Sequence, residues 1–273
     1  MSNKPAAVRD LAEPRRNDAQ RCLHKQHRDS ERPGHETAAI YHKGVHAMVH
    51  LPFEDRIEAG RALADELAAR RLGEHVIILA LTRGGVPVGF SVADRLRLPL
   101  EVVVARKIGV PWQPELAMGA IAGSVLILDE PMIRQLQLSD EDVEAVVARE
   151  QEEMKRREEL YRGGRPALDL EGKTVVIVDD GLATGSTMTA AARYVRELRP
   201  CRVIIGVPVG SGEACLRLRN EADDVVCVAT PERFFAVGEW YRSFRQVSDS
   251  EVARLLSENR LRLQGYTAPR SAA

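Results

Sequence analysis

Apolar residues follow two alternating patterns through most of the chain. In residues 53–73, Ile57, Leu63 and Leu67 fall on one side of a helix among charged residues, which is typical of an amphipathic helix. A continuous apolar run, Val76–Leu81, comes next. A run without polar alternation predicts a strand that is covered on both faces.

The same order of strand and helix is repeated toward the C-terminus. Strands that alternate with helices predict an α/β fold with a parallel sheet. A long, heavily charged helix is predicted at Ser139–Tyr161, because the segment opens with an S-x-x-D capping sequence and is closed by Gly163 and Gly164. Further strands are predicted at Leu100–Ala105, Ser124–Leu128, Val175–Val178, Val203–Val207 and Asp224–Val228. Further helices are predicted at Val86–Leu96, Ala190–Leu198, Gly212–Asn220 and from Ser248 to about Leu263.

Residues 1–46 differ in character from the rest of the chain. They are rich in Arg, His, Asp, Glu and Gln and contain hardly any Leu, Ile or Val. Such a segment cannot bury enough apolar area to offset the entropy of ordering. We therefore expect a flexible polar arm at residues 1–46, a folded domain at 47–265 and a short tail at 266–273. The histidines in and just after the arm favour a solvated tail over a metal site, since no cysteine or carboxylate stands at a fitting spacing.

Composition and charge exclude several classes of function. The 273 residues contain 39 Lys and Arg against 40 Asp and Glu, a net charge of −1, so neither nucleic acid nor an anionic membrane is expected as a partner. The apolar runs are far shorter than the roughly 20 residues that span a bilayer. The N-terminus lacks the apolar core of a secretory signal, and we expect a cytoplasmic protein. The four cysteines include no C-x-x-C pair, which disfavours a zinc knuckle.

The segment that carries chemistry runs from Val175 to Met188, with the sequence V-V-I-V-D-D-G-L-A-T-G-S-T-M. An apolar strand delivers Asp179 and Asp180 to its carboxyl end, where open α/β sheets bind ligands. Small residues and hydroxyls then lead into a helix, and this combination favours a bound phosphate. Two carboxylates would repel a phosphate but suit a sugar diol or a metal bound to one. A phosphorylated sugar is therefore favoured over a turn that the carboxylates merely cap.

This segment resembles the phosphoribosyl-pyrophosphate motif of the type I phosphoribosyltransferases, and the resemblance extends over roughly residues 50–260. It implies a type I phosphoribosyltransferase-like parallel sheet flanked by helices, with a small hood region. It also implies that Asp179 and Asp180 hold the ribose hydroxyls and, indirectly, a metal ion. The substrate-binding loop implied by the resemblance contains Gly181, Leu182, Ala183, Thr184, Gly185, Ser186 and Thr187, of which residues 183–187 wrap the 5-phosphate.

Two further segments resemble parts of the same family. The turn Thr82-Arg83-Gly84-Gly85 resembles its pyrophosphate loop, in which Arg83 would act in catalysis; by composition alone the turn is also an ordinary strand-to-helix connection. Arg106 and Lys107 open a segment that ends at Gly119, where the family has a mobile loop. The resemblance implies that Arg106 binds substrate and that Lys107 acts in catalysis. The simpler interpretation of these two is a pair of solvated charges at a strand end.

Taken as a whole, the region from Leu81 to Phe244 most resembles a subgroup described as predicted phosphoribosyltransferases. The resemblance implies an enzyme of nucleotide salvage that uses Mg²⁺, phosphoribosyl pyrophosphate and a small nitrogen acceptor, and it leaves a homodimer open. Ala183 stands where enzymes for 6-oxopurines typically have an aspartate, which disfavours hypoxanthine and guanine. The aromatic segment Thr230–Phe244 is either a stacking surface for a base or part of the core. A regulator that only binds phosphoribosyl pyrophosphate, and a hydrolase of a related sugar phosphate, are the alternatives. Replacing Asp179 and Asp180 by Asn is expected to remove function at little cost to folding.

Overall fold

The computed structural model describes residues 50–267. The predicted arm lies outside these residues, as does most of the predicted tail, so both stay predictions. Within the described range the predicted strands and helices form at nearly the predicted places.

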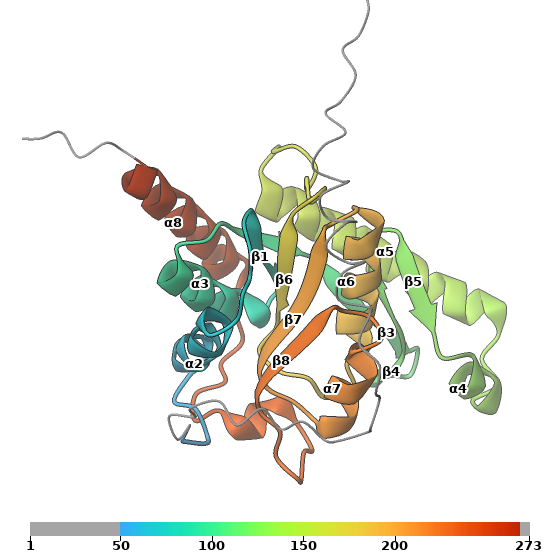
Figure 1. Cartoon of the computed structure of the whole chain (residues 1–273). Helices are drawn as coiled ribbons and strands as arrows, with labels where there is room; N and C mark the ends of the chain where they lie inside the picture. The colour runs from blue at the N-terminus through green and yellow to red at the C-terminus, as the bar shows by residue number, and fades with distance from the viewer. Residues whose placement is uncertain (1–49, 268–273) are drawn as a thin grey trace, which may run out of the picture. The chain divides into compact units, whose positions relative to one another are not determined.

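The centre of the fold is a sheet of five parallel strands, as the alternation of strands and helices predicts (Figure 1). Ile78 lies opposite both Leu100 and Val176, which fixes the register of the three strands in which they lie. In spatial order the strands are β2 (Leu100–Val103), β1 (Val76–Leu81), β6 (Thr174–Val178), β7 (Arg202–Val209) and β8 (Asp224–Ala229).

Helices cover both faces of this sheet (Figure 1). Successive residues of a strand point to opposite faces, so each strand must bury two apolar sets. Ile78 and Val176 pack with the helices of one face, whereas Leu79 and Ile177 pack with those of the other. The first face carries α2 (Arg56–Ala68), α3 (Gly85–Leu96) and α8 (Asp249–Thr267), and the second carries α6 (Ser186–Glu197) and α7 (Gly212–Leu218).

A second, antiparallel sheet lies between β2 and β6 in the chain, and the sequence pattern does not predict it. The strand predicted at Ser124–Leu128 belongs to this sheet rather than to the parallel one, because no crossover helix precedes it. The segment from Arg106 to Gly119 is a hairpin with a two-residue turn, which only antiparallel strands allow. The sheet contains β3 (Ala105–Val110), β4 (Gln113–Ala122) and β5 (Val125–Leu128), and α4 (Glu130–Gln135) and α5 (Asp140–Arg162) follow it.

Helix α5 has the ends that its sequence predicts. The Ser139 hydroxyl accepts the backbone N–H of Asp142 at 3.1 Å, and Gly163 ends the helix with φ at 55°. Glycine at this position avoids the strain that a side chain would suffer in the left-handed region. None of the helices in the described part of the chain is long and apolar enough to cross a membrane.

A small packed region lies beside the carboxyl end of β6 and corresponds to the expected hood. Here the residues before α2 meet the segment after β8, which contains a short 3-10 helix, Val237–Trp240. The backbone N–H of Phe53 donates to the carbonyl of Trp240 at 2.8 Å, and Phe53 and Tyr241 share a third apolar cluster. The Tyr241 hydroxyl donates to the backbone carbonyl of Asp180 at 2.5 Å, so this region is fastened to the loop after β6.

We expect Asn259→Ala to lower the free energy of unfolding by about 1–3 kcal/mol, the cost of leaving a buried amide without a partner. Buried Asn259 of α8 accepts the N–H of Leu100 at 2.9 Å and donates to the carbonyl of Leu98 at 3.2 Å, which fixes the start of β2. Urea unfolding measures the change. Arg254→Ala on the same helix removes only an exposed ion pair with Glu258, worth about 0.3 kcal/mol. An equal loss of stability in the two variants would show that the hydrogen bonds of Asn259 do not hold the start of β2.

Candidate functional site

The loops that follow β1 and β6 meet at the carboxyl edge of the sheet, because these two parallel strands are neighbours. The contact is too close for side chains. A Cβ on Gly84 would overlap Oδ2 of Asp180, and one on Gly85 would lie 2.6 Å from the carbonyl oxygen of Val178. Both glycines are therefore required by the approach of the two loops rather than by the turn alone.

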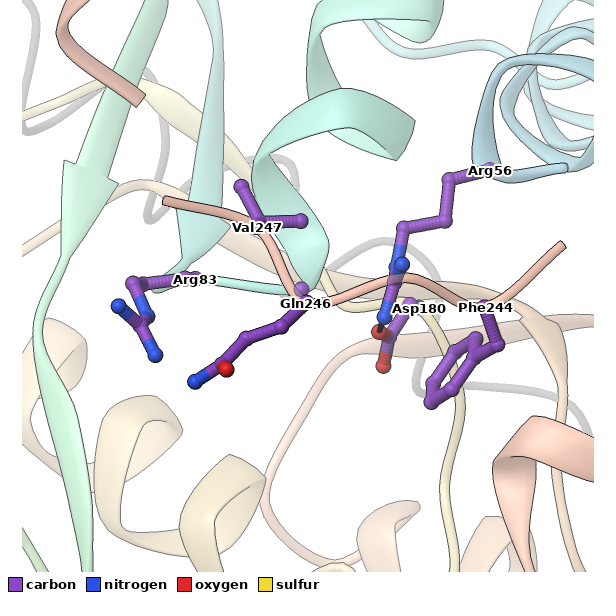
Figure 2. Close-up of a pocket in the computed structure, with 7 residues that line it drawn as sticks. Arg56, Arg83, Asp180, Phe244, Gln246 and Val247 are labelled. Carbon is purple, nitrogen blue, oxygen red and sulfur yellow. Dashed lines mark hydrogen bonds and ion pairs between the residues drawn. The ribbon is translucent and has the colours of Figure 1, made fainter. Parts of the chain in front are cut away.

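A cavity of about 380 Å³ opens where these loops meet (Figure 2). Three of its lining residues, Arg83, Gly84 and Asp180, are among the site residues that the sequence predicts. Figure 2 shows Arg83 and the amide of Gln246 on one side of the close-up, with the Arg56–Asp180 pair and the Phe244 ring on the other. The full lining is Arg56, Arg83, Gly84, Asp180, Phe244, Gln246 and Val247.

The two carboxylates at the end of β6 differ in their partners. Oδ2 of Asp180 accepts from Nε of Arg56 and lies against its Nη2, both at 2.8 Å, and the two side chains are only 13% and 10% exposed. Oδ1 of Asp179 accepts the backbone N–H of Asp180 at 2.8 Å. Asp179 is not among the residues that line the cavity. Asp180 is thus the carboxylate that faces the cavity, and it is already paired with a cation.

Burial governs the ionisation of this pair. It raises the pKa of Asp179 well above the usual range, and the neighbouring charge of Asp180 raises it further. Burial also raises the pKa of Asp180, whereas the charge and hydrogen bonds of Arg56 act in the opposite direction. Two adjacent, largely buried carboxylates are costly when both are charged, and Arg56 offsets part of the cost.

The loop from Gly181 to Thr187 has the form expected of a phosphate site. Gly185 has φ at 76° and precedes α6, so Ser186 and Thr187 stand in the first turn of that helix. Backbone N–H groups in a first helical turn have no partner within the helix and attract anions. Ala183 and Thr184 are exposed, whereas the remaining two residues of the loop, Gly181 and Leu182, are buried.

The carbonyl side of this loop is anchored to neighbouring elements. The N–H of Leu182 donates to the carbonyl of Val209 at 3.0 Å. The Ser211 hydroxyl donates to the carbonyl of Ala183 at 2.9 Å, and Nη2 of Arg217 donates to that of Thr184 at 2.6 Å. Buried Gly181 and Leu182 therefore anchor the loop, and the carbonyls of Ala183 and Thr184 are bonded to neighbouring elements. Residues 183–187 are the part of the loop that can contact a ligand.

Arg83 is held from the side of α8. Its Nη1 lies 3.5 Å from Oδ1 of Asp249, which also accepts from the Tyr161 hydroxyl at 2.5 Å. This hydrogen bond and the nearby arginines lower the pKa of Asp249. The Thr82–Arg83 peptide is cis, and the buried hydroxyl of Thr82 has no hydrogen-bond partner among the described residues.

The structure does not bring Arg106 and Lys107 to the cavity. Arg106 on β3 donates through Nε to Glu150 of α5 at 2.9 Å. Lys107 donates to the carbonyl of Glu115 across the hairpin at 2.6 Å, and its Nζ lies 3.4 Å from the Glu115 carboxylate. Neither residue lines the cavity, so their roles toward a substrate stay predictions.

Sequence reasoning missed Arg56, Gln246 and Val247 as site residues. Arg56 is the first residue of α2, where it reads as one more charge on an amphipathic helix. No local motif marks it, because its partner Asp180 is 124 positions away. The aromatic segment did single out Phe244, which lines the cavity, whereas Tyr241 of the same segment belongs to the core.

The donor set at the site fits a metal ion only in a limited way. The described residues contain no group of three or more His, Cys, Asp or Glu that could hold an ion. Asp179 and Asp180 are the nearby carboxylates, and one oxygen of Asp180 is taken by Arg56. Such a set suits an ion whose other ligands are supplied by substrate oxygens and water.

Comparison with known proteins gives consistent matches. Residues 54–242 match the family described as phosphoribosyl transferase domain. The chain is 47% identical over 205 residues to a Mycobacterium tuberculosis protein named "Putative phosphoribosyl transferase", an alignment that covers 75% of this chain and 46% of the relative. The crystal structure of a Thermus thermophilus protein superposes with a TM-score of 0.62 at 42% identity, covering 76% of this chain and 98% of that one.

The chain spans about half the length of the curated relatives it matches. Another of them, ribose-phosphate pyrophosphokinase 1 of Listeria innocua, is 25% identical over 210 residues, which cover 75% of this chain and 48% of the relative. The likeness therefore concerns the folded domain that carries the site.

Gly84→Ala is expected to displace the Asp180 carboxylate and to lower the free energy of unfolding by about 1–3 kcal/mol, the usual cost of overpacking. Gly212→Ala is the matched control, since a Cβ there meets nothing within 4 Å, and it should be neutral or stabilising by up to about 1 kcal/mol. Thermal and urea unfolding compare the two. A neutral Gly84→Ala would show that the loops are not in contact in solution.

Asp179→Asn and Asp180→Asn should change stability by different amounts. Because burial raises the pKa of Asp179, its ionised form disfavours folding at neutral pH, and Asn should therefore raise the free energy of unfolding. This gain should fade as the pH falls toward the unfolded value of about 4, where the carboxyl is protonated in both states. Asp180→Asn should gain less than Asp179→Asn, because it also removes the charged partner of the buried Arg56, which offsets part of the cost of burying Asp180.

Urea unfolding in metal-free buffer at several pH values measures both effects. The expectation from the sequence that both aspartates can be exchanged at little cost to folding stays a prediction, and this experiment tests it. Equal stability of the two variants at neutral pH would contradict this account of the pair.

Proposed function

Because this chain belongs to the phosphoribosyl transferase domain family, we propose that it transfers the 5-phosphoribosyl group of phosphoribosyl pyrophosphate to a nitrogen acceptor. The supporting observation is one cavity that Arg83, Gly84 and Asp180 line together, beside a loop suited to phosphate. The Arg83 cation, the backbone amide of Gly84 and the Asp180 carboxylate lie together there because β1 and β6, which precede them, are neighbours in the sheet. This is the chemistry needed to hold a pyrophosphate and a ribose side by side.

In the proposed reaction the bond from ribose C1 to the pyrophosphate oxygen breaks and a bond from C1 to the acceptor nitrogen forms. Pyrophosphate leaves with the electron pair of the broken bond. The charge that develops on it would be stabilised by Arg83 and by the amides at Gly84 and Gly85, where α3 begins. Asp180, which faces the cavity at the end of β6, would hold the ribose hydroxyls and favour positive charge on the ring. The expected contact of Asp179 with the ribose stays a prediction.

The 5-phosphate would lie in the loop at residues 183–187. There the first turn of α6 presents free amides, and the hydroxyls of Thr184 and Ser186 lie 3.2 Å apart. Mg²⁺ bound to the pyrophosphate would add positive charge at the leaving group. Oδ1 of Asp180 is the carboxylate oxygen at hand to hold such an ion, with substrate oxygens and water as its other ligands, and a contribution from Asp179 stays a prediction.

The acceptor is proposed only as a nitrogenous base or another nitrogen nucleophile. Phe244 offers a ring beside the cavity on which a planar acceptor could stack. Ala183 gives no carboxylate to a 6-oxopurine, which disfavours hypoxanthine and guanine as acceptors.

Pyrophosphate release from Mg²⁺-phosphoribosyl pyrophosphate tests this function, measured with and without a pool of purines, pyrimidines and other nitrogen nucleophiles. Release that depends on the pool is expected, and splitting the pool identifies the acceptor. Release without any acceptor would indicate a hydrolase instead. Tight binding without release under any condition would indicate a regulator.

In the same assay, Arg83→Ala should lower turnover about 10²- to 10³-fold, the loss expected when one stabilising donor is removed from a developing charge. Arg134→Ala on α4 is the control, because its side chain is 70% exposed, pairs with Glu130 one helical turn away and does not line the cavity. Unchanged turnover in Arg83→Ala would remove Arg83 from the proposed mechanism.

A further inference from the structure

Arg56 reaches two parts of the chain that both border the cavity. Its Nε and Nη2 contact Oδ2 of Asp180 after β6, each at 2.8 Å. Its Nη1 donates to the backbone carbonyl of Arg245 at 2.8 Å, in the segment before α8. One buried side chain from the start of α2 thus bridges two loops that are 65 positions apart along the chain (245 minus 180).

The flat face of the guanidinium is also in use. Its central carbon lies 3.9 Å from the ring centre of Phe244 and 6.0 Å from that of Tyr241. A planar, delocalised cation can stack on a ring while its edge donates hydrogen bonds, which a lysine cannot do. Figure 2 shows Arg56 reaching Asp180 beside the Phe244 ring, at the wall of the cavity rather than away from it.

The geometry points to Arg56 as a positioning residue: we propose that it fixes the Asp180 carboxylate for the ribose and ties the acceptor side of the cavity, Phe244–Val247, to the same carboxylate. This rests on the proposed function. Arg56 occupies Oδ2 of Asp180, and Oδ1 is the oxygen that it does not use.

Two walls restrict the carboxylate of Asp180. Arg56 holds one oxygen from two nitrogens, and Gly84 lies so close that a Cβ there would overlap Oδ2 and lie 3.2 Å from Oδ1. Without Arg56 the carboxylate could rotate away from the cavity, and residues 244–247 would lose the contact that joins them to it. A fixed carboxylate binds a diol more tightly than a free one, since the cost of ordering it has already been met in folding.

The proposal predicts a selective loss of ligand affinity. Arg56→Gln should weaken phosphoribosyl pyrophosphate and ribose 5-phosphate by about 10- to 100-fold, the range for losing a well-placed hydrogen bond to a charged group. Inorganic pyrophosphate has no ribose, and its affinity should change by less than about 3-fold, within the scatter for sites that share no contact. Isothermal titration calorimetry with these three ligands in the presence of Mg²⁺ gives the comparison.

Two further variants separate positioning from charge and from general stability. Arg56→Lys keeps a cation but not the planar fork, so it should recover only part of the lost affinity. Arg95→Gln is the matched control. Arg95 of α3 donates to Asp65 of α2, the helix that carries Arg56, at 2.6 Å; its side chain is 52% exposed and does not line the cavity. Ligand affinities of Arg95→Gln should equal those of the wild type.

A double-variant cycle keeps the test decisive if Arg56→Gln proves unstable. Because Arg56 acts through Asp180, the double change Arg56→Gln/Asp180→Asn should weaken ribose 5-phosphate no more than Asp180→Asn alone. Thermal unfolding of each variant, with and without ligand, identifies the folded samples.

The outcomes are distinct. Loss for the ribose ligands alone, with a non-additive cycle, supports the proposal. Equal loss for pyrophosphate, additive effects, or full recovery with lysine would overturn it. Wild-type protein that binds none of the three ligands would instead overturn the proposed function, whatever the behaviour of Arg56.

Discussion

The close approach of the loops after β1 and β6 is the contact on which the site depends. These strands are neighbours in a parallel sheet, so their carboxyl ends deliver Gly84 and Gly85 directly against Asp179 and Asp180. No Cβ fits between them, and the backbone of one loop therefore sets where the carboxylates of the other stand. The cavity, the position of Arg83 and the opening beside Asp180 all follow from this contact.

That approach has an electrostatic consequence, because it places two largely buried carboxylates side by side. Groups from distant elements offset part of the cost. Arg56 from the start of α2 pairs with Asp180, and Tyr241 from the segment after β8 donates to the Asp180 carbonyl. On the other side, Asp249 of α8 accepts from Tyr161 of α5 and lies near Arg83. Residues from helices α2, α5 and α8 thus hold the side chains that border the cavity, so the geometry of the candidate site depends on the packing of the domain.

The antiparallel sheet could not be predicted from the hydrophobic pattern. The segment between β2 and β6 contains Arg106 and Lys107, which the family resemblance linked to the substrate. In the structure this segment includes a hairpin. Arg106 pairs with Glu150 of α5, and Lys107 donates to Glu115 across the hairpin. A two-residue turn and an antiparallel ladder are local features, but strand patterns alone do not tell which sheet a strand will join. Which sheet a strand joins depends on the elements against which it packs, and these elements lie elsewhere in the chain.

By itself the sequence determined the five parallel strands, the helices between them, and the motifs that supply Arg83, Gly84, Asp180 and the loop at residues 181–187. These follow from hydrophobic period, capping residues and small residues in short segments, all of which act over a few neighbouring positions. Only the tertiary structure decided that Arg56, Phe244 and Gln246 belong to the same cavity, and that one oxygen of Asp180 is already taken. The physical reason is that charge pairing and burial act through space, between side chains more than a hundred positions apart, and leave no mark on the local pattern of either partner.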